Sequence, residues 1–173
     1  MASEIDGSEL RVEGEPLPHA RGLLEALDSL WSTDDPLRLA ELIVVEAAGL
    51  LPGLIVAVAL VQPARSDRIS IVAGSEDWCA KELPVEGSIG GLALREGVAV
   101  ERSPADSVDS SRLLGHGVQL MRAVPLVPPK TPGAELGGSA ALLFMTRSPA
   151  GFAHAERRLM DEFARLAGLA LER

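Results

Sequence analysis

The first regular pattern of apolar and polar residues along the chain is helical. From residue 18 onward, Leu23, Leu27 and Leu30 recur at a spacing that places them on one face of a helix. Leu24 and Trp31 extend that apolar face to one side. The pattern stops at the segment STDDPL, which predicts a first helix that ends there.

A second helix is predicted immediately after this break. Asp34 or Asp35 can cap its N-terminus, and Pro36 suits the first turn, where its missing N–H is not needed. The apolar residues run through LRLAELIVVEAAGLL and stop before Pro52 and Gly53. Two helices therefore precede the first predicted strand.

The remaining apolar segments predict strands. Segment 54–64 is β-branched and almost wholly apolar, which is typical of a strand buried on both faces. It can form a hairpin with 68–74 through a turn at Ser66–Asp67. Further strands are predicted at 98–102, 118–127 and 138–147, with an irregular section at 75–87 and one short helix in the loop 103–117. Short adjacent strands with helices at both ends predict an α+β fold with an antiparallel sheet, and not the βαβαβ alternation of a doubly wound nucleotide-binding fold.

The last predicted helix, within 148–173, carries two adjacent apolar stripes: Leu159, Phe163, Leu166 and Ala170 in one, and Met160, Ala164, Ala167 and Leu171 in the other. One stripe can cover the sheet. The second, with Leu24 and Trp31, would then be available to a partner helix, which predicts a homodimer through the terminal helices. The alternative is a single wide face buried within the chain.

The glycine-rich segment 85–101, VEGSIGGLALREGVAVE, has the composition of a phosphate-binding loop but not its spacing. Such a loop needs GxGxxG or GxxxxGK[ST] after a strand. Here the spacing is G-x-x-G-G, with no Lys–Ser/Thr after it. The segment instead predicts a helix that Ser88 caps, that packs closely through Gly90 and Gly91, and that ends at Gly97.

Composition and charge narrow the classes of partner. The chain has 173 residues and a net charge of −9, which disfavours nucleic acid and anionic membranes as partners. Its longest apolar stretch, 47–61, is broken by Pro52 and Gly53 and does not predict a membrane span. Residues 1–16 predict a flexible acidic tail, and 17–173 a single domain. The single cysteine, Cys79, excludes a disulfide framework and suits a reducing cytoplasm.

The ordered set of segments resembles the GAF domain family of sensory modules, over 23–171. The segments that carry the resemblance are LPVEGSIGGLALREGVAVE, the strand ending in Val124–Pro125–Leu126, and the closing strand and helix with GFAHAERRLM. The resemblance implies a central antiparallel sheet of five to six strands, with the terminal helices packed on one face. Short helices and loops over the other face would enclose a small-molecule pocket roofed by 75–115.

The resemblance places four candidate ligand-binding residues at that pocket: Trp78, Ile89, Leu92 and Arg122. Arg122 interrupts an apolar strand, where alternation puts it on the same face as Leu120, Val124 and Leu126. It could bind a carboxylate or phosphate of a ligand, or it could pair with Glu101, Asp106 or Asp109. Trp78 could line the pocket or pack under the irregular segment.

Few other residues of the chain are candidates for catalysis or for cofactor binding. Cys79 could be a redox thiol or a bilin attachment site, but Lys81 is its only nearby cation in sequence, which favours an inert thiol. His116 could be a haem ligand or a surface residue, and the three histidines lack metal-ligand spacing. Haem and bilin are thus disfavoured, no metal site is predicted, and no catalytic constellation is found.

These observations predict a small-molecule-sensing or regulatory GAF-like domain of a signal-transduction protein. It would pass the ligand state through its terminal helices to an output domain. The alternative is a dimerisation or scaffold module without a ligand, whose own leucines fill the pocket. An enzyme of the methionine-sulfoxide-reductase type is a third hypothesis, which the single cysteine disfavours because that chemistry uses several.

Overall fold

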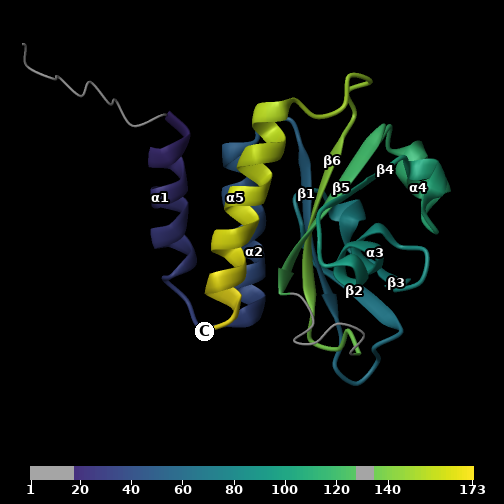
Figure 1. Ribbon diagram of the computed structural model, residues 1–173, viewed down its shortest axis with the longest axis horizontal. Coiled ribbons are helices and arrows are strands. Elements are labelled where there is room, and N and C mark those ends of the chain that lie inside the picture. Colours follow the sequence, from purple (N-terminus) through teal and green to yellow (C-terminus); the bar gives the residue numbers. More distant parts are fainter. Residues whose placement is uncertain (1–17, 128–134) are drawn as a thin grey trace, which may run out of the picture.

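A computed structural model describes residues 18–127 and 135–173 of the chain. Six antiparallel strands form one sheet in the order β3-β2-β1-β6-β5-β4 (Figure 1). The strands are β1 (Ile55–Val61), β2 (Arg68–Gly74), β3 (Glu82–Pro84), β4 (Val100–Arg102), β5 (Leu120–Val127) and β6 (Ala140–Thr146). The predicted tail at 1–16 lies outside the described residues.

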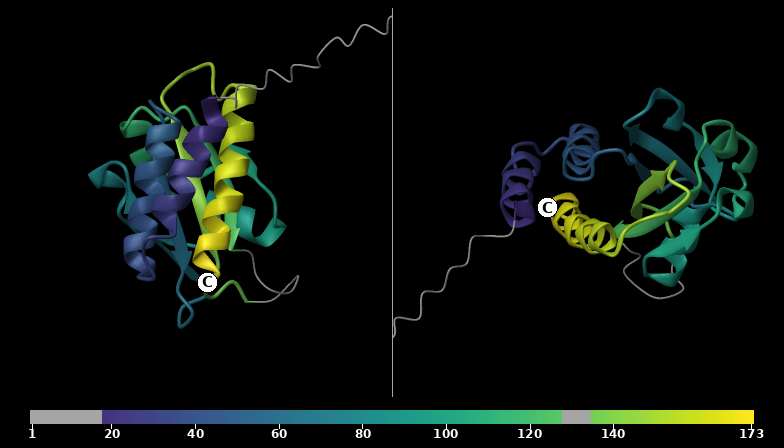
Figure 2. Two further views of the ribbon diagram at one scale, coloured as in Figure 1. Left: turned by 90° about the vertical axis from the view of Figure 1, so that its left-hand side faces the viewer. Right: turned by 90° about the horizontal axis from the view of Figure 1, so that it is seen from above.

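Three long helices lie on one side of the sheet: two of them pack against it, and the first packs on the outside of those two, while two short helices lie over the other face (Figures 1 and 2). The long helices are α1 (Pro18–Leu30), α2 (Pro36–Leu50) and α5 (His154–Leu171), and the short ones are α3 (Ile89–Glu96) and α4 (Ser110–Gly115). Single 3-10 turns at Asp77–Cys79 and Pro104–Asp106 complete the second layer. The α+β antiparallel fold predicted from the sequence is thereby confirmed.

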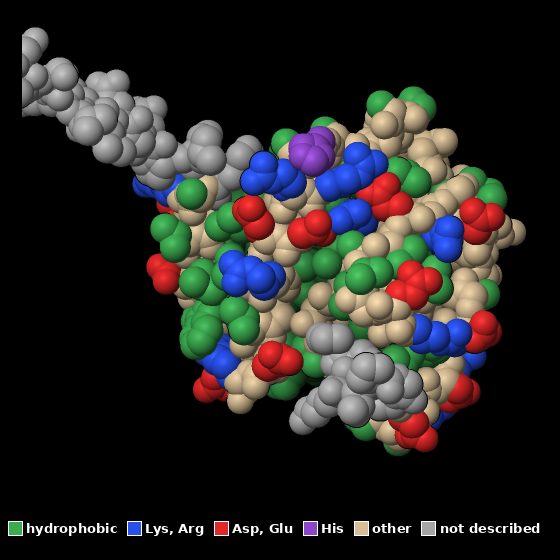
Figure 3. Space-filling model, in the orientation of Figure 1, with side chains coloured by type: hydrophobic (Ala, Val, Ile, Leu, Met, Phe, Trp, Pro, Cys, Tyr) green, Lys and Arg blue, Asp and Glu red, His purple; other side chains and the backbone are tan. Residues whose placement is uncertain are grey.

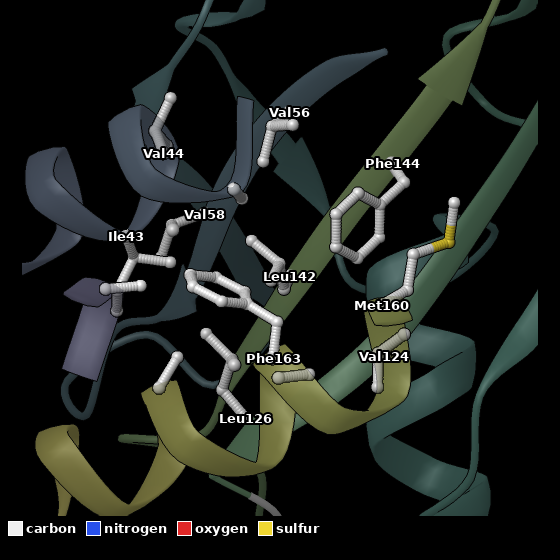
Figure 4. Close-up of a cluster of buried hydrophobic side chains, with 14 of the residues drawn as sticks. Ile43, Val44, Val56, Val58, Val124, Leu126, Leu142, Phe144, Met160 and Phe163 are labelled. Atoms are coloured by element: carbon white, nitrogen blue, oxygen red, sulfur yellow. The ribbon is translucent and has the colours of Figure 1, made fainter. Parts of the chain in front are cut away.

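Side-chain alternation along the central strands divides the core into two clusters. On the helix side, Leu142 and Phe144 of β6 pack with Phe163 of α5 and with residues of α2 and β1 (Figure 4). On the other side, Leu143 and Met145 of the same strand pack under α3 and α4. Both faces of β6 are therefore buried, which is why its sequence is continuously apolar.

The glycine-rich segment forms α3 with the predicted caps. The Ser88 hydroxyl accepts a hydrogen bond from the Gly91 N–H at 3.1 Å, and Gly97 ends the helix with a left-handed φ of 67°. Gly91 lies so close to Val85 that a Cβ there would be 2.2 Å from the Val85 carbonyl oxygen. The glycines therefore serve close packing of α3 against the preceding chain.

The two apolar stripes of α5 form one wide buried face. Leu159, Phe163 and Ala170 are buried, and so are Met160, Ala164 and Ala167 of the second stripe. Helices α1 and α2 pack beside α5 on the helix side of the sheet. They therefore bury the part of the α5 surface that the sheet alone would leave exposed. The prediction that the second stripe stays free for a partner is thus wrong, and the single wide face is what the chain forms.

Strand β3 is the one described strand that the sequence did not indicate. Its three residues lie in the section predicted to be irregular, and they pair with Arg68, Ile69 and Ser70 of β2. The strand is too short to show alternation, and Pro84 ends it at the edge of the sheet.

Within 18–127 and 135–173, no helix has both the length and the apolar composition to cross a membrane.

Candidate functional site

A cavity lies between the sheet and its roof, on the face opposite the long helices. Its volume is about 50 Å³, and we call it the inner cavity. The sheet contributes apolar side chains to its lining, and the roof contributes both apolar and polar ones. The lining residues are Ala57, Ala59, Ile69, Ile71, Trp78, Cys79, Leu83, Ser88, Ile89, Gly90, Ser107, Asp109, Arg112, Leu113, Met121, Leu143 and Met145.

A second, wider pocket adjoins the inner cavity and measures about 160 Å³. We call it the outer pocket. The two share Ser88, Ile89, Ser107 and Met121 in their linings. The outer pocket carries the charged residues Glu86, Arg95, Arg102 and Asp106, two acidic and two basic. It therefore has no excess of either charge, in contrast to the inner cavity described below.

Three of the four predicted ligand-binding residues line these pockets. Trp78 and Ile89 line the inner cavity, and Leu92 lines the outer pocket. Each lies in the roof, as the resemblance implied. Whether they contact a ligand remains a prediction.

Arg122 lies on the other face of the sheet, which corrects its expected place at the pocket. Its guanidinium donates to Glu101 Oε1 at 3.0 Å and to both carboxylate oxygens of Asp161 at 2.7 and 2.9 Å. Asp161 belongs to α5, so the side chain points toward the long helices. The pairing with Glu101 was one of the alternatives, and alternation had already grouped Arg122 with Val124 and Leu126, which pack on the helix side.

Arg122 is part of an ion-pair network that joins the β4–β5 edge to α5. Glu101 of β4 is opposite Arg122 of β5 in register, and it also accepts from Arg157 of α5 at 2.6 and 3.0 Å. The hydrogen bonds from Arg157, followed by the charges of Arg157 and Arg122, lower the pKa of Glu101 despite its partial burial. The carboxylate thus remains ionised and ties the strand to the helix.

The polar side of the inner cavity is built on Asp109, which sequence reasoning considered only as a partner for Arg122. Asp109 is 8% exposed. Lys81 Nζ donates to its Oδ1 at 2.7 Å, and Arg112 Nη1 donates to its Oδ2 at 3.2 Å. Lys81 and Asp109 are 28 residues apart, so no local pattern could have joined them. The apolar cavity therefore has one buried carboxylate with two cations.

Trp78 is held in place by contacts with its ring and with its ring nitrogen. One face stacks on His116, with ring centroids 4.3 Å apart and planes 7° apart, and the Arg112 guanidinium lies 5.5 Å from the ring centre. Trp78 Nε1 donates to Glu76, which also forms a two-bond ion pair with Arg147. The stacking on Trp78 fixes His116 as an exposed packing residue.

Glu76 provides a pH-dependent contribution to stability. The hydrogen bonds from Arg147, and then the one from Trp78, lower its pKa from 4.5 to about 2 against the opposing effect of burial. A folded-state pKa below the unfolded one stabilises the fold above the unfolded pKa, and that stability is lost as pH falls toward the folded value. The loss is therefore expected between pH 4.5 and about 2.

We predict that Glu76→Gln lowers the free energy of unfolding near neutral pH by about 0.5–1 kcal/mol, since the ion pair is partly exposed. The variant should lose less stability on acidification than the unmodified protein, because it lacks this titrating group. Urea denaturation across the acid range measures both effects, with Glu162→Gln, exposed on α5, as the control. A Glu76 pKa near 4.5 by NMR would contradict the described ion pair.

Cys79 lies in the wall of the inner cavity but is poorly suited to nucleophilic chemistry. It is 4% exposed, and burial raises the pKa of its thiol. The thiol is therefore protonated near neutral pH, whereas the thiolate is the reactive form. Among residues 18–127 and 135–173, no group of three or more His, Cys, Asp or Glu side chains is arranged to hold a metal ion.

No protein-family model matches the sequence, and a search of curated proteins finds no match. Solved structures do match the fold. The free methionine-R-sulfoxide reductase of Neisseria meningitidis, solved with its substrate, is 16% identical, with a TM-score of 0.70 over 89% of this chain and 88% of that one. The GAF domain of an Acinetobacter phosphoenolpyruvate-protein phosphotransferase is 12% identical, with a TM-score of 0.65 over 89% and 92%.

A phycoerythrobilin-bound GAF domain from a cyanobacterial phytochrome is similar at the same level. It is 12% identical, with a TM-score of 0.64 over 90% of this chain and 95% of that one. Identities this low show the fold and not the ligand. The chain therefore has a GAF-like fold, which occurs both in GAF domains of other proteins and in a free methionine-R-sulfoxide reductase.

Proposed function

We propose that the chain is a sensory or regulatory GAF-like domain that binds a small molecule in the inner cavity. The observation that carries this proposal is the cavity itself, which combines an apolar floor with a buried Asp109 paired with Arg112 in its wall. Convergent polar groups in an otherwise apolar pocket are what a small-ligand site requires. The single thiol in the cavity wall is buried and protonated, which weighs against the reductase chemistry named for some structural neighbours.

The ion-pair network supports transmission from the cavity to the terminal helices. Helix α3 lines the cavity and leads directly into β4, and Glu101 of β4 binds Arg157 of α5. A ligand that displaces α3 would shift β4 and hence these bonds. Packed elements joined by such bonds can carry a coupling free energy between sites, provided that they have two arrangements.

The test is a search for ligands with a matched pair of variants. Mass spectrometry of small molecules that co-purify with the protein is combined with a thermal-shift screen of metabolites, since a ligand of the folded state raises the midpoint. Ala59→Val fills the inner cavity from β1, and Ala99→Val adds the same atoms on the helix side. A ligand of the inner cavity should no longer raise the thermal midpoint of Ala59→Val, but it should still raise that of Ala99→Val. If no compound co-purifies or shifts the midpoint, the sensor proposal fails.

A second candidate function, homodimerisation, is favoured by large apolar side chains exposed on the long helices. Leu24 of α1 is 65% exposed and Trp31, just after α1, is 50% exposed, and Leu37, Val45 and Leu169 are also exposed. Figure 3 shows hydrophobic side chains at the surface over α1, at the left of the view. Apolar groups gathered on one side of a protein are typical of interaction surfaces. We propose that a second copy packs there.

We predict that Leu24→Glu shifts the protein toward the monomer without loss of fold, because it places a charge in the proposed interface. Val98→Glu is the matched control, since Val98 is 55% exposed and follows α3, on the opposite side of the sheet. Sedimentation velocity over a range of concentrations measures the distribution. A chain that stays monomeric at high concentration before any substitution is inconsistent with the dimer.

A further inference from the structure

The hydrogen-bonding capacity left unused in the inner cavity consists of donors. Arg112 donates from Nη1 to Asp109, and neither its Nε nor its Nη2 donates to any of the described residues. The Ser107 hydroxyl accepts from the Asp109 N–H at 3.3 Å and donates to no group in the described part of the chain. Trp78 Nε1, by contrast, is already bonded to Glu76.

The acceptors in the same wall are already engaged. Both oxygens of Asp109 accept from cations, Oδ1 from Lys81 and Oδ2 from Arg112. The Ser88 hydroxyl accepts from Gly91 and donates to the Val85 carbonyl. Counting Asp109 against Lys81 and Arg112 leaves one positive charge in excess. A ligand that brings acceptors and a negative charge would therefore use the free donors of the wall.

The apolar part of the cavity indicates which chemical group the ligand carries beside its anionic group. Its floor is apolar and includes Ile69, Ile71 and Leu113. The volume of about 50 Å³ corresponds to about two water-sized groups, at roughly 30 Å³ for each water. An inorganic oxyanion would leave the apolar floor without a partner, whereas a short hydrocarbon chain of about one or two carbon atoms fits it, with the head group at the Arg112 and Ser107 side of the wall.

We infer that the inner cavity is a site for a short aliphatic carboxylate, whose head group accepts hydrogen bonds from Arg112 and Ser107 while its chain lies on the apolar floor. The inference rests on the proposed ligand-binding function and names its ligand class. Arg112 is suited to the head group because its planar fork matches a carboxylate, and its contacts with Asp109 and Trp78 hold that fork in place. The length of the ligand's hydrocarbon chain determines the selectivity, since a longer acid must extend into the outer pocket.

The test compares acetate, propionate and butyrate with acetamide, propionamide and butyramide at constant pH and ionic strength. Each amide has the shape of its acid without the charge. Binding to the full chain is measured by thermal shift and by NMR chemical-shift changes of backbone amides, which are expected to centre on Ser107, Asp109 and Arg112. We expect at least one acid to bind at least about tenfold more tightly than its amide, as charge-assisted hydrogen bonds require.

Three variants locate the binding. Arg112→Gln should weaken carboxylate binding by about tenfold or more, and Ser107→Ala by about two- to fivefold. Arg165→Gln, which removes an exposed arginine of α5, should leave it unchanged. Because Arg112 also supports Asp109, the unliganded thermal midpoint of each variant is measured first. If Arg112→Gln does not fold, Ser107→Ala and the comparison of acids with amides still decide the question.

The outcomes separate this inference from the broader proposal. Amides that bind as tightly as the acids, or acids whose affinity is unaffected by both cavity substitutions, overturn the carboxylate site. If another class of compound then gives a shift that Ala59→Val abolishes, the sensor proposal stands and only the ligand class is wrong. If no compound of any class binds, both fail.

Discussion

Replacing Gly91 by alanine is expected to destabilise the protein by about 3 kcal/mol and to disturb the inner cavity. A Cβ at this position would lie 2.2 Å from the Val85 carbonyl oxygen and 2.8 Å from Val85 Cγ1. The obstacle is backbone, which cannot move aside as a flexible side chain can. Helix α3 would have to shift away from Val85, and the cap hydrogen bond between Ser88 and the Gly91 N–H would be strained.

The matched control is Gly49→Ala, for which the opposite sign is expected. Gly49 lies in α2, and a Cβ there would meet nothing within 4 Å. Alanine is the better helix former by about 1 kcal/mol, so this variant should be slightly more stable than the unmodified protein. Urea denaturation measures both changes. Equal stabilities for Gly91→Ala and the unmodified chain would mean that α3 does not pack on Val85 as described.

Truncation of Phe163 to alanine should cost about 3–5 kcal/mol, because a fully buried ring on the helix side of the sheet is removed. Phe163 is fully buried between α5 and the sheet, where it faces Leu142 and neighbours Leu126 (Figure 4). Its removal forfeits the transfer free energy of the ring and leaves a cavity that the surrounding strands can only partly fill. Since Phe163 holds α5 on the sheet, ligand-dependent changes at α5 should weaken as well.

Leu169→Ala provides the control for this prediction on the same helix. Leu169 is 49% exposed, so its truncation should change the free energy of unfolding by no more than about 0.5 kcal/mol. The measurement is made by urea denaturation at low protein concentration, which removes any contribution from association. Similar losses for both variants would show that Phe163 is not the anchor of α5.

The local pattern of the sequence was sufficient for most elements. The glycine-rich segment predicted both ends of α3, because a cap at Ser88 and a left-handed residue at Gly97 are decided by nearby atoms. Strand β2 was predicted at its observed bounds for a similar reason, since alternation and turn residues mark it locally. Strand β3 was not, because its only support is pairing with β2.

The candidate site was predicted less well than the fold. The roof residues Trp78 and Ile89 were placed by resemblance and do line the inner cavity, but Arg122 was placed there against its own strand alternation. An arginine in an apolar strand signals a partner without showing which face the partner occupies. The face was decided by Asp161 of α5, which accepts from Arg122 and is 39 residues further along the chain.

The sequence by itself determined the α+β class, the antiparallel sheet between terminal helices and the close packing of α3, because periodicity, capping and glycine geometry act over a few residues. Only the tertiary structure decided that α5 is buried on both stripes, that Arg122 binds α5, and that Lys81, Asp109 and Arg112 meet at one cavity. Most of these contacts join segments far apart in the chain. Burial of apolar surface stabilises the α5 contacts, and pairing offsets the desolvation cost of the buried charges; neither effect is encoded in a local pattern.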